Sequence, residues 1–221
     1  MPCEIIPALL VNSEEHALVQ ITKLGDYSGW MQIDILDGTL NRFMSFSDAN
    51  ALSLLLPENP IELHLMVANP KEHIEEWQRV LSAKQSRRAI WHIEAMADHA
   101  ELIEYCRAHN WQCGIALGPN TKIEALRPYL DRIDEVLVLG VHPGQSGQTL
   151  IPKTLDTVRA LKLTPNKTFT IGFDGGINGQ NILDLKDAGV ERFCLASAIF
   201  KAVSPTNTLA HLTQKLGIQQ T

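Results

Sequence analysis

Pro7-Ala8-Leu9-Leu10-Val11-Asn12 ends the first apolar run of the chain. A dinucleotide-binding α/β fold would carry a glycine-rich GxGxxG turn at this point, directly after its first strand. These six residues contain no glycine. The stretch therefore argues against an open doubly wound sheet, which is the main competitor to a closed barrel for a chain that alternates strands and helices.

Short apolar runs rich in β-branched residues recur along the rest of the chain, separated by amphipathic stretches. Ser13, Pro70, Pro152 and Asn178 are helix-start signals in four of these stretches. The predicted strands cover about residues 3–9, 29–35, 60–66, 88–93, 111–117, 134–140, 168–173 and 191–196. A segment that can be helical follows each strand. Eight such units predict an α/β protein, with a single (β/α)8 TIM barrel as one domain over residues 1–221.

Composition and charge bear on whether the protein binds nucleic acid or a membrane. The 221 residues are 45% hydrophobic and 20% charged, as in ordinary globular proteins. The net charge of -6 comes without basic runs, which disfavours nucleic acid. No window approaches the roughly 20 apolar residues of a membrane span, and the N-terminus lacks the pattern of a signal peptide. We therefore expect a cytoplasmic protein that binds neither nucleic acid nor membrane.

Polar residues interrupt the apolar runs near the ends of several predicted strands, where a (β/α)8 barrel carries its catalytic groups. Because side chains alternate along a strand, residues two positions apart share a face. The pairs that share a face are Gln32 and Asp34, His64 and Met66, and His92 and Glu94. Ionisable groups in a barrel mouth cost free energy unless they pair or bind a metal. We interpret Asp34 and Asp174 as functional, whereas His92 and Glu94 fit a hydrogen-bonded inner pair as well as a catalytic role.

Turns with small residues follow the late strands at 141–148, 174–178 and 196–198. Glycine permits close approach of the backbone to a ligand, and amides at helix N-termini favour an anion. In such barrels, the loops after strands seven and eight commonly bind phosphate. The predicted phosphate- and substrate-binding residues in these turns are Gly144, Gln145, Ser146, Gly147, Gly175, Gly176, Ala196 and Ser197.

Five ordered motifs resemble the ribulose-phosphate 3-epimerase family, from Ile5 to about Phe200. Ile33-Asp34-Ile35-Leu36-Asp37-Gly38 resembles (H)VDxMDG, His64-Leu65-Met66 resembles HLM, Val141-His142-Pro143-Gly144-Gln145-Ser146-Gly147-Gln148 resembles VNPGFGGQ, Asp174-Gly175-Gly176-Ile177-Asn178 matches DGGIN, and Ala196-Ser197-Ala198-Ile199-Phe200 resembles GSAIF. The resemblance implies a phosphosugar-binding TIM barrel of the ribulose-phosphate-binding type.

The resemblance also implies an activity. This is the interconversion of D-ribulose 5-phosphate and D-xylulose 5-phosphate, or of a close ketose phosphate, by a metal-assisted 1,1-proton transfer in the pentose phosphate pathway. Residue by residue, Asp34 and Asp174 match the aspartates that remove and return the C3 proton on opposite faces. With His64 they match metal ligands, and His64 and Met66 match substrate-contacting positions. The family further implies a homo-oligomer.

The chain departs from the family pattern around this site. Gln32 stands where the family has a metal-binding histidine, Ala8 where it has a serine, and Leu36 and Leu139 where it has methionines. An amide oxygen is a weaker and harder ligand than imidazole, so zinc affinity should fall and manganese or magnesium becomes relatively less disfavoured. The resemblance therefore predicts a divalent metal, with zinc, iron, manganese and magnesium all open.

Two alternatives belong to other classes. The first is a non-catalytic phosphosugar-binding barrel whose metal site eroded at Gln32. The second is a related barrel enzyme, such as a sugar-phosphate decarboxylase or an aldolase. The second is disfavoured because the decarboxylase pattern Asp-x-Lys-x-x-Asp needs a lysine that Ile33-Asp34-Ile35-Leu36-Asp37 does not offer, and no strand end presents an evident Schiff-base lysine.

Overall fold

The computed structural model describes residues 3–56 and 58–218 and confirms the predicted barrel. The strands are β1 (Glu4–Leu9), β2 (Met31–Ile35), β3 (Ile61–Leu65), β4 (Arg87–His92), β5 (Gln112–Leu117), β6 (Glu135–Leu139), β7 (Thr170–Asp174) and β8 (Arg192–Leu195). Consecutive strands pair in parallel, and β1 also pairs with β8, which closes the barrel. All eight predicted strands are present, with ends shifted by one or two residues.

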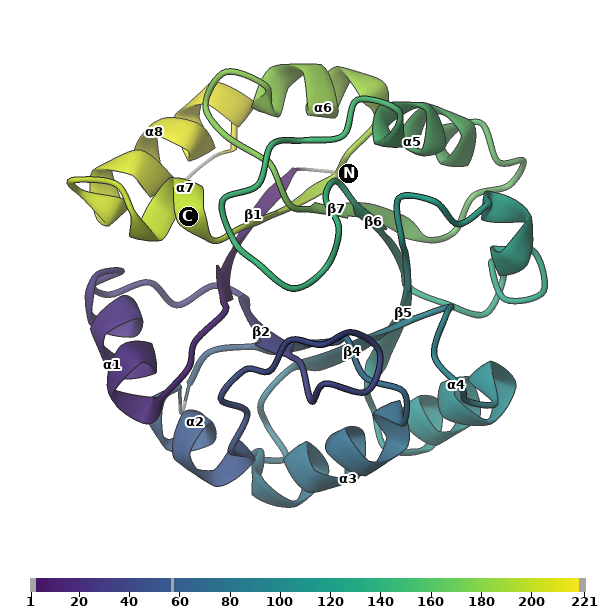
Figure 1. Ribbon diagram of the computed structural model, residues 1–221, viewed down its shortest axis with the longest axis horizontal. Coiled ribbons are helices and arrows are strands. Elements are labelled where there is room, and N and C mark those ends of the chain that lie inside the picture. Colours follow the sequence, from purple (N-terminus) through teal and green to yellow (C-terminus); the bar gives the residue numbers. More distant parts are fainter. Residues whose placement is uncertain (1–2, 57, 219–221) are drawn as a thin grey trace.

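A ring of helices surrounds the barrel (Figure 1). They are α1 (Glu14–Thr22), α2 (Ala49–Leu55), α3 (Pro70–Val80), α4 (His99–Ala108), the 3₁₀ helix η1 (Ile123–Leu126), α5 (Thr154–Lys162), α6 (Ile182–Ala188), α7 (Ser197–Phe200) and α8 (Pro205–Leu216). Ser13 caps α1 as predicted, because its hydroxyl accepts from the backbone N–H of His16 at 3.1 Å. Among the described residues, no helix combines the length and apolar character needed to cross a membrane.

Three helix predictions differ from the structure in detail. The segment after β5 forms only η1, because Pro119 and Pro128, which have no backbone N–H to donate, lie on either side of it. α5 begins at Thr154, two residues after the predicted start at Pro152, and α6 begins at Ile182. Asn178 instead forms a turn before α6, in which its side chain accepts from the backbone N–H of Gln180.

Side-chain alternation divides the buried residues into two layers. Ile33 and Leu65 point outward into the large apolar core that includes the helices, as predicted. A smaller apolar cluster, which includes Ile6, Ala8 and Leu137, belongs to residues that alternate to the other face of their strands. Several inward positions are apolar, whereas the polar inward positions mark either a buried ionic network or a candidate functional site.

One group of inward polar residues lies toward the N-terminal ends of the strands. The buried guanidinium of Arg88 pairs with Glu62 and lies 3.3 Å from a carboxylate oxygen of Glu135, which also pairs with Arg192. Gly172 leaves the space for this network, since a Cβ there would overlap Oε1 of Glu135. Glu62 thus has ionic partners of its own, apart from the polar cluster at the other end of the barrel.

Candidate active site

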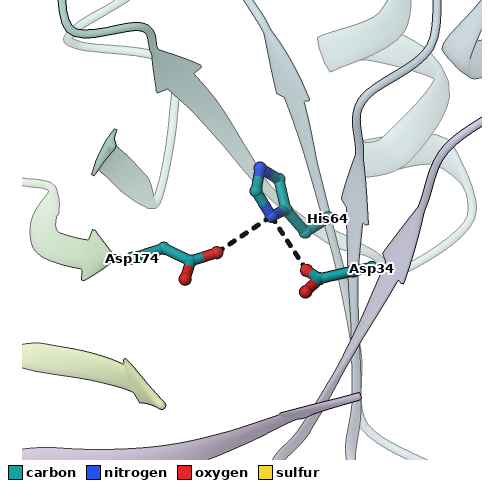
Figure 2. A group of neighbouring side chains, drawn as sticks. All are labelled: Asp34, His64 and Asp174. Atoms are coloured by element: carbon teal, nitrogen blue, oxygen red, sulfur yellow. Dashed lines mark hydrogen bonds and ion pairs between the residues drawn. The ribbon is translucent and has the colours of Figure 1, made fainter. Parts of the chain in front are cut away.

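Two carboxylates from different parts of the sequence converge on one histidine (Figure 2). β2 and β3 pair Asp34 directly with His64, and β7 ends at Asp174. Nδ1 of His64 lies 3.0 Å from Oδ1 of Asp34 and 3.1 Å from Oδ2 of Asp174. The parallel barrel brings these three side chains together because all of them lie at the C-terminal ends of their strands.

Gln32 lies beside the two carboxylates and is fully buried. Its Nε2 donates to Oδ1 of Asp34 at 2.8 Å and to Oδ2 of Asp174 at 2.9 Å. Its Oε1 is buried and has no hydrogen-bond partner among the described residues. The amide therefore links two acids that would otherwise repel each other, and its own oxygen remains available.

The acids and His64 change one another's protonation. Burial raises the pKa of Asp34, against the lowering effect of its hydrogen bond with His64, and the nearby Asp174 raises it further. Burial alone would lower the pKa of His64, but its hydrogen bonds with Asp174 and Asp34 raise that pKa to about 10. Without a metal, His64 is therefore an imidazolium at neutral pH.

We expect the metal-free protein to lose thermal stability as the pH rises from about 6.5 to about 10. A histidine whose pKa is raised from 6.5 to about 10 by folding stabilises the folded state fully below pH 6.5, and this contribution disappears as the pH passes through 10. Thermal unfolding in the presence of a chelator measures this. The His64→Gln variant should show a flatter dependence, and an equal slope in both proteins would contradict the assignment.

The other side of His64 contacts a second histidine. Nε2 of His64 lies 3.1 Å from Nε2 of His92, and Nδ1 of His92 lies 3.4 Å from Oε2 of Glu94. Burial would raise the pKa of Glu94, but hydrogen bonds from His92 and Thr121 lower it to about 2. His92 is 2% exposed. Of the two roles open to His92 and Glu94, this geometry favours the hydrogen-bonded inner pair.

The predicted binding residues line one pocket at the C-terminal end of the barrel. Those around it are Asp34, His64, Met66, Gly144, Gln145, Ser146, Gly147, Asp174, Gly175, Gly176, Ala196 and Ser197. Leu139, at a position where the family has methionine, also lines it. Gln32 is the exception among the predicted site residues: it is buried and reaches the pocket through Asp34 and Asp174.

Two loops that lie far apart in the sequence meet beside the pocket. The loop after β6 extends over the barrel opening (Figure 1) and contains Gly144, whose φ is +128°. A Cβ on Gly144 would overlap the ring of Phe43, in the loop after β2. Only glycine fits this contact. Phe43 is not among the residues predicted from the sequence, because nothing in the local sequence indicates that the two loops touch.

Lys201 is a second residue outside the predicted set. Its Nζ lies 3.3 Å from the position that a Cβ on Gly147 would occupy, and Ser197 lies beside the same glycine. Within the described chain, Lys201 has no carboxylate within ion-pair distance. A signal was available, since Lys201 directly follows the motif at 196–200 and lies one helical turn after Ser197.

The cluster has the donor set for a divalent metal ion. Asp34, His64 and Asp174 each offer one ligand atom, and these atoms lie within 4.8 Å of one another. The nitrogen and oxygen of the Gln32 amide can exchange places by rotation of the amide group. Oε1, which has no partner among the described residues, would then lie beside the oxygens of Asp34 and Asp174. Two carboxylates, one imidazole and one amide oxygen fit a metal, and the oxygen-rich set suits manganese or magnesium better than an all-imidazole set would.

Comparison with known proteins identifies the family. The model of the Ribulose-phosphate 3 epimerase family matches residues 4–200. The chain belongs to this family. Ribulose-phosphate 3-epimerase from Mycobacterium tuberculosis is 30% identical over 192 residues, which cover 85% of this chain and 82% of the relative. The enzyme of the same name from Schizosaccharomyces pombe is 26% identical over a match that covers 95% of this chain and 92% of the relative. Membership in the ribulose-phosphate 3-epimerase family indicates an enzyme of the epimerase class.

Solved structures confirm the fold of this family member. KGPDC from Streptococcus mutans superposes with a TM-score of 0.72 at 14% identity and covers 98% of each chain. The 3-hexulose-6-phosphate synthase from Salmonella typhimurium gives a TM-score of 0.70 at 16% identity and covers 98% of this chain and all of that one. At this identity the likeness concerns the barrel alone, and the epimerase assignment rests on the sequence relatives.

Proposed function

We propose that this protein interconverts D-ribulose 5-phosphate and D-xylulose 5-phosphate, or a close ketose phosphate, by a two-aspartate proton transfer. One observation carries the proposal: carboxylates of β2 and β7 converge from two sides on Nδ1 of His64 inside a pocket lined by glycine-containing turns. Family membership supports the same activity.

The two carboxylates suit the reaction because the C3 proton lies next to the ketose carbonyl and is therefore acidic. Inversion at C3 needs one group to remove this proton and another to return one on the opposite face. Asp34 and Asp174 belong to different strands and approach the same nitrogen of His64 from two directions (Figure 2), and we propose that they face C3 from its two faces. The raised pKa of Asp34 makes its carboxylate a better base than an exposed aspartate.

We propose that Asp34, His64 and Asp174 hold a divalent metal, with Gln32 as an additional oxygen ligand. When bound, such an ion supplies positive charge beside the oxygens of the ketose. Without such an ion, the N–H groups of the Gln32 amide and of His64 Nδ1 hold the oxygens of Asp34 and Asp174 within 3.1 Å of a donor. Zinc, iron, manganese and magnesium are the candidates.

The phosphate group is assigned to the turns beside Gly147, Gly175 and Ser197, with Lys201 as its cation. We expect Lys201→Ala to raise KM for the phosphorylated ketose about tenfold, which corresponds to about 1.4 kcal/mol. Because the lysine is exposed, high salt should shrink the difference from the unmodified protein. Steady-state kinetics at low and high ionic strength measure both effects.

Lys84→Ala is the matched control for this variant. Lys84 is also an exposed lysine, but it lies between α3 and β4, at the end of the barrel away from the pocket. This control should leave KM unchanged. An unchanged KM in Lys201→Ala would remove Lys201 from the phosphate site.

A direct assay tests the proposed reaction. Purified protein receives zinc, iron, manganese or magnesium in turn, and both product formation and deuterium exchange from solvent into C3 are followed by NMR. We expect interconversion and exchange with at least one metal. Stabilisation of the protein by ketose phosphate without any exchange would instead establish the non-catalytic sugar-phosphate-binding barrel.

A further inference from the structure

A chain of hydrogen-bonding groups runs from the pocket into the barrel wall. It begins at His64, whose Nδ1 faces Asp34 and Asp174 and whose Nε2 lies 3.1 Å from Nε2 of His92. The rings of the two histidines are nearly parallel, at 13°. Both histidines are almost fully buried, so water does not replace these contacts. The two facing Nε2 atoms must share one proton, because two N–H groups or two lone pairs would repel each other.

Glu94 contacts the other ring nitrogen of His92. Its Oε1 accepts from the backbone N–H of Gly118 at 3.0 Å and from the hydroxyl of Thr121. Its Oε2 lies 3.4 Å from Nδ1 of His92. Gly118 has no side chain to displace the carboxylate, since a Cβ there would lie 2.8 Å from Oε1. The backbone amide thus fixes a carboxylate that can only accept a hydrogen bond from His92.

The protons along the chain follow from this fixed acceptor. Nδ1 of His92 carries a hydrogen toward Glu94, which leaves a lone pair on Nε2 of His92. Nε2 of His64 must then donate to His92. Nδ1 of His64, the nitrogen between the two aspartates, is consequently the only position of this ring that can exchange its proton for a metal ion.

We propose that Glu94 is a positioning residue that, through His92, fixes the hydrogen on Nε2 of His64 and so commits Nδ1 of His64 to the metal. This inference rests on the proposed function, because it concerns the same metal site. Glu94 contacts His92, and His92 contacts the proposed metal ligand His64. Glu94 acts by setting proton positions rather than by touching the reacting atoms.

Glu94→Gln tests the proposal, because the replacement keeps the size of the side chain. The Gly118 N–H still requires an acceptor, so the amide oxygen of the new side chain should remain there and its NH2 group should face His92. His92 would then accept this hydrogen bond at Nδ1 and carry its own hydrogen on Nε2. Nε2 of His64 would have to accept from His92, so the hydrogen of His64 would lie on Nδ1. Zinc affinity should fall about 10–100-fold.

Two measurements read this out. Long-range ¹H–¹⁵N NMR of the metal-free protein should show the hydrogen of His92 on Nδ1 in the unmodified protein and on Nε2 in Glu94→Gln. Calorimetric titration with Zn²⁺ alone should show the loss of affinity. A role in packing alone would lower the melting temperature but leave both the tautomer and the zinc affinity in place, and that result would overturn the proposal.

Thr121→Val is the matched control. It removes one hydroxyl donor to Glu94 but keeps the carboxylate and its Gly118 contact, so the His92 tautomer and zinc affinity should remain. The proposed epimerase activity and the proposed role of Glu94 can be contradicted independently of each other. The epimerase assignment fails if no metal supports turnover, even when the tautomers are as stated. The role of Glu94 fails if His92 already carries its hydrogen on Nε2 in the unmodified protein, whatever the turnover.

Discussion

Asp34→Asn and Asp174→Asn are each expected to lower kcat for epimerisation by about 10²–10⁴-fold or more. Each replacement removes the only group that the proposal places on one face of C3, and an amide cannot accept the proton. The size of the side chain and its neighbours are kept, because Gln32 and His64 can still bond to the amide. The rate of interconversion in both directions measures the effect.

A second readout separates proton transfer from loss of binding. Each single variant retains the acid on the other face, so it should still exchange the C3 hydrogen of one epimer with deuterated solvent while failing to convert it. The two variants should prefer opposite epimers. If both variants exchange the same epimer, the two acids do not lie on opposite faces of the substrate. Glu124→Asn, which changes an exposed acid on η1, is the control and should keep full activity.

Gln32→His is expected to raise zinc affinity by about 10–100-fold or more, because changes even to second-layer residues alter metal affinity by that factor. Imidazole is a better ligand for zinc than an amide oxygen. The Gln32 side chain lies within 3 Å of both carboxylates, so a histidine at this position would face the same point. Elemental analysis of the purified protein and titration with zinc measure the change.

The metal-free form of Gln32→His should show the opposite effect. The Gln32 amide donates to Asp34 and Asp174 through the same nitrogen, whereas one imidazole nitrogen has a single hydrogen to offer. The variant should therefore unfold at a lower temperature without metal and recover with zinc. Gln180→His, on an exposed turn, is the control and should change neither property. A Gln32→His protein that gains neither metal nor rate would show that Gln32 does not occupy a ligand position.

Several features of this site were accessible from the sequence, because they depend on local rules. The alternation of apolar runs with helix-start signals predicted the eight strands. Strand periodicity placed Gln32 and Asp34 on one face of their strand and Ile33 on the other. Motif order gave Asp34, His64 and Asp174, and the family comparison agrees with that resemblance. In each case neighbouring residues alone determine the pattern.

The features that the sequence could not predict are contacts between distant segments. Whether Glu62 served the site or a separate network depended on Arg88 and Glu135 from other strands. The contact of Phe43 with Gly144 joins two loops whose relative position is set only when the barrel closes.

The sequence by itself thus determined the barrel and indicated Asp34 and Asp174 as candidate acids, because periodicity and motif order are properties of the chain. Only the tertiary structure decided how those acids are held. The Gln32 amide bonds to both carboxylates, and Glu94 reaches His64 through His92. The direction of each hydrogen bond depends on which donor faces which acceptor across the barrel, and barrel closure sets that arrangement.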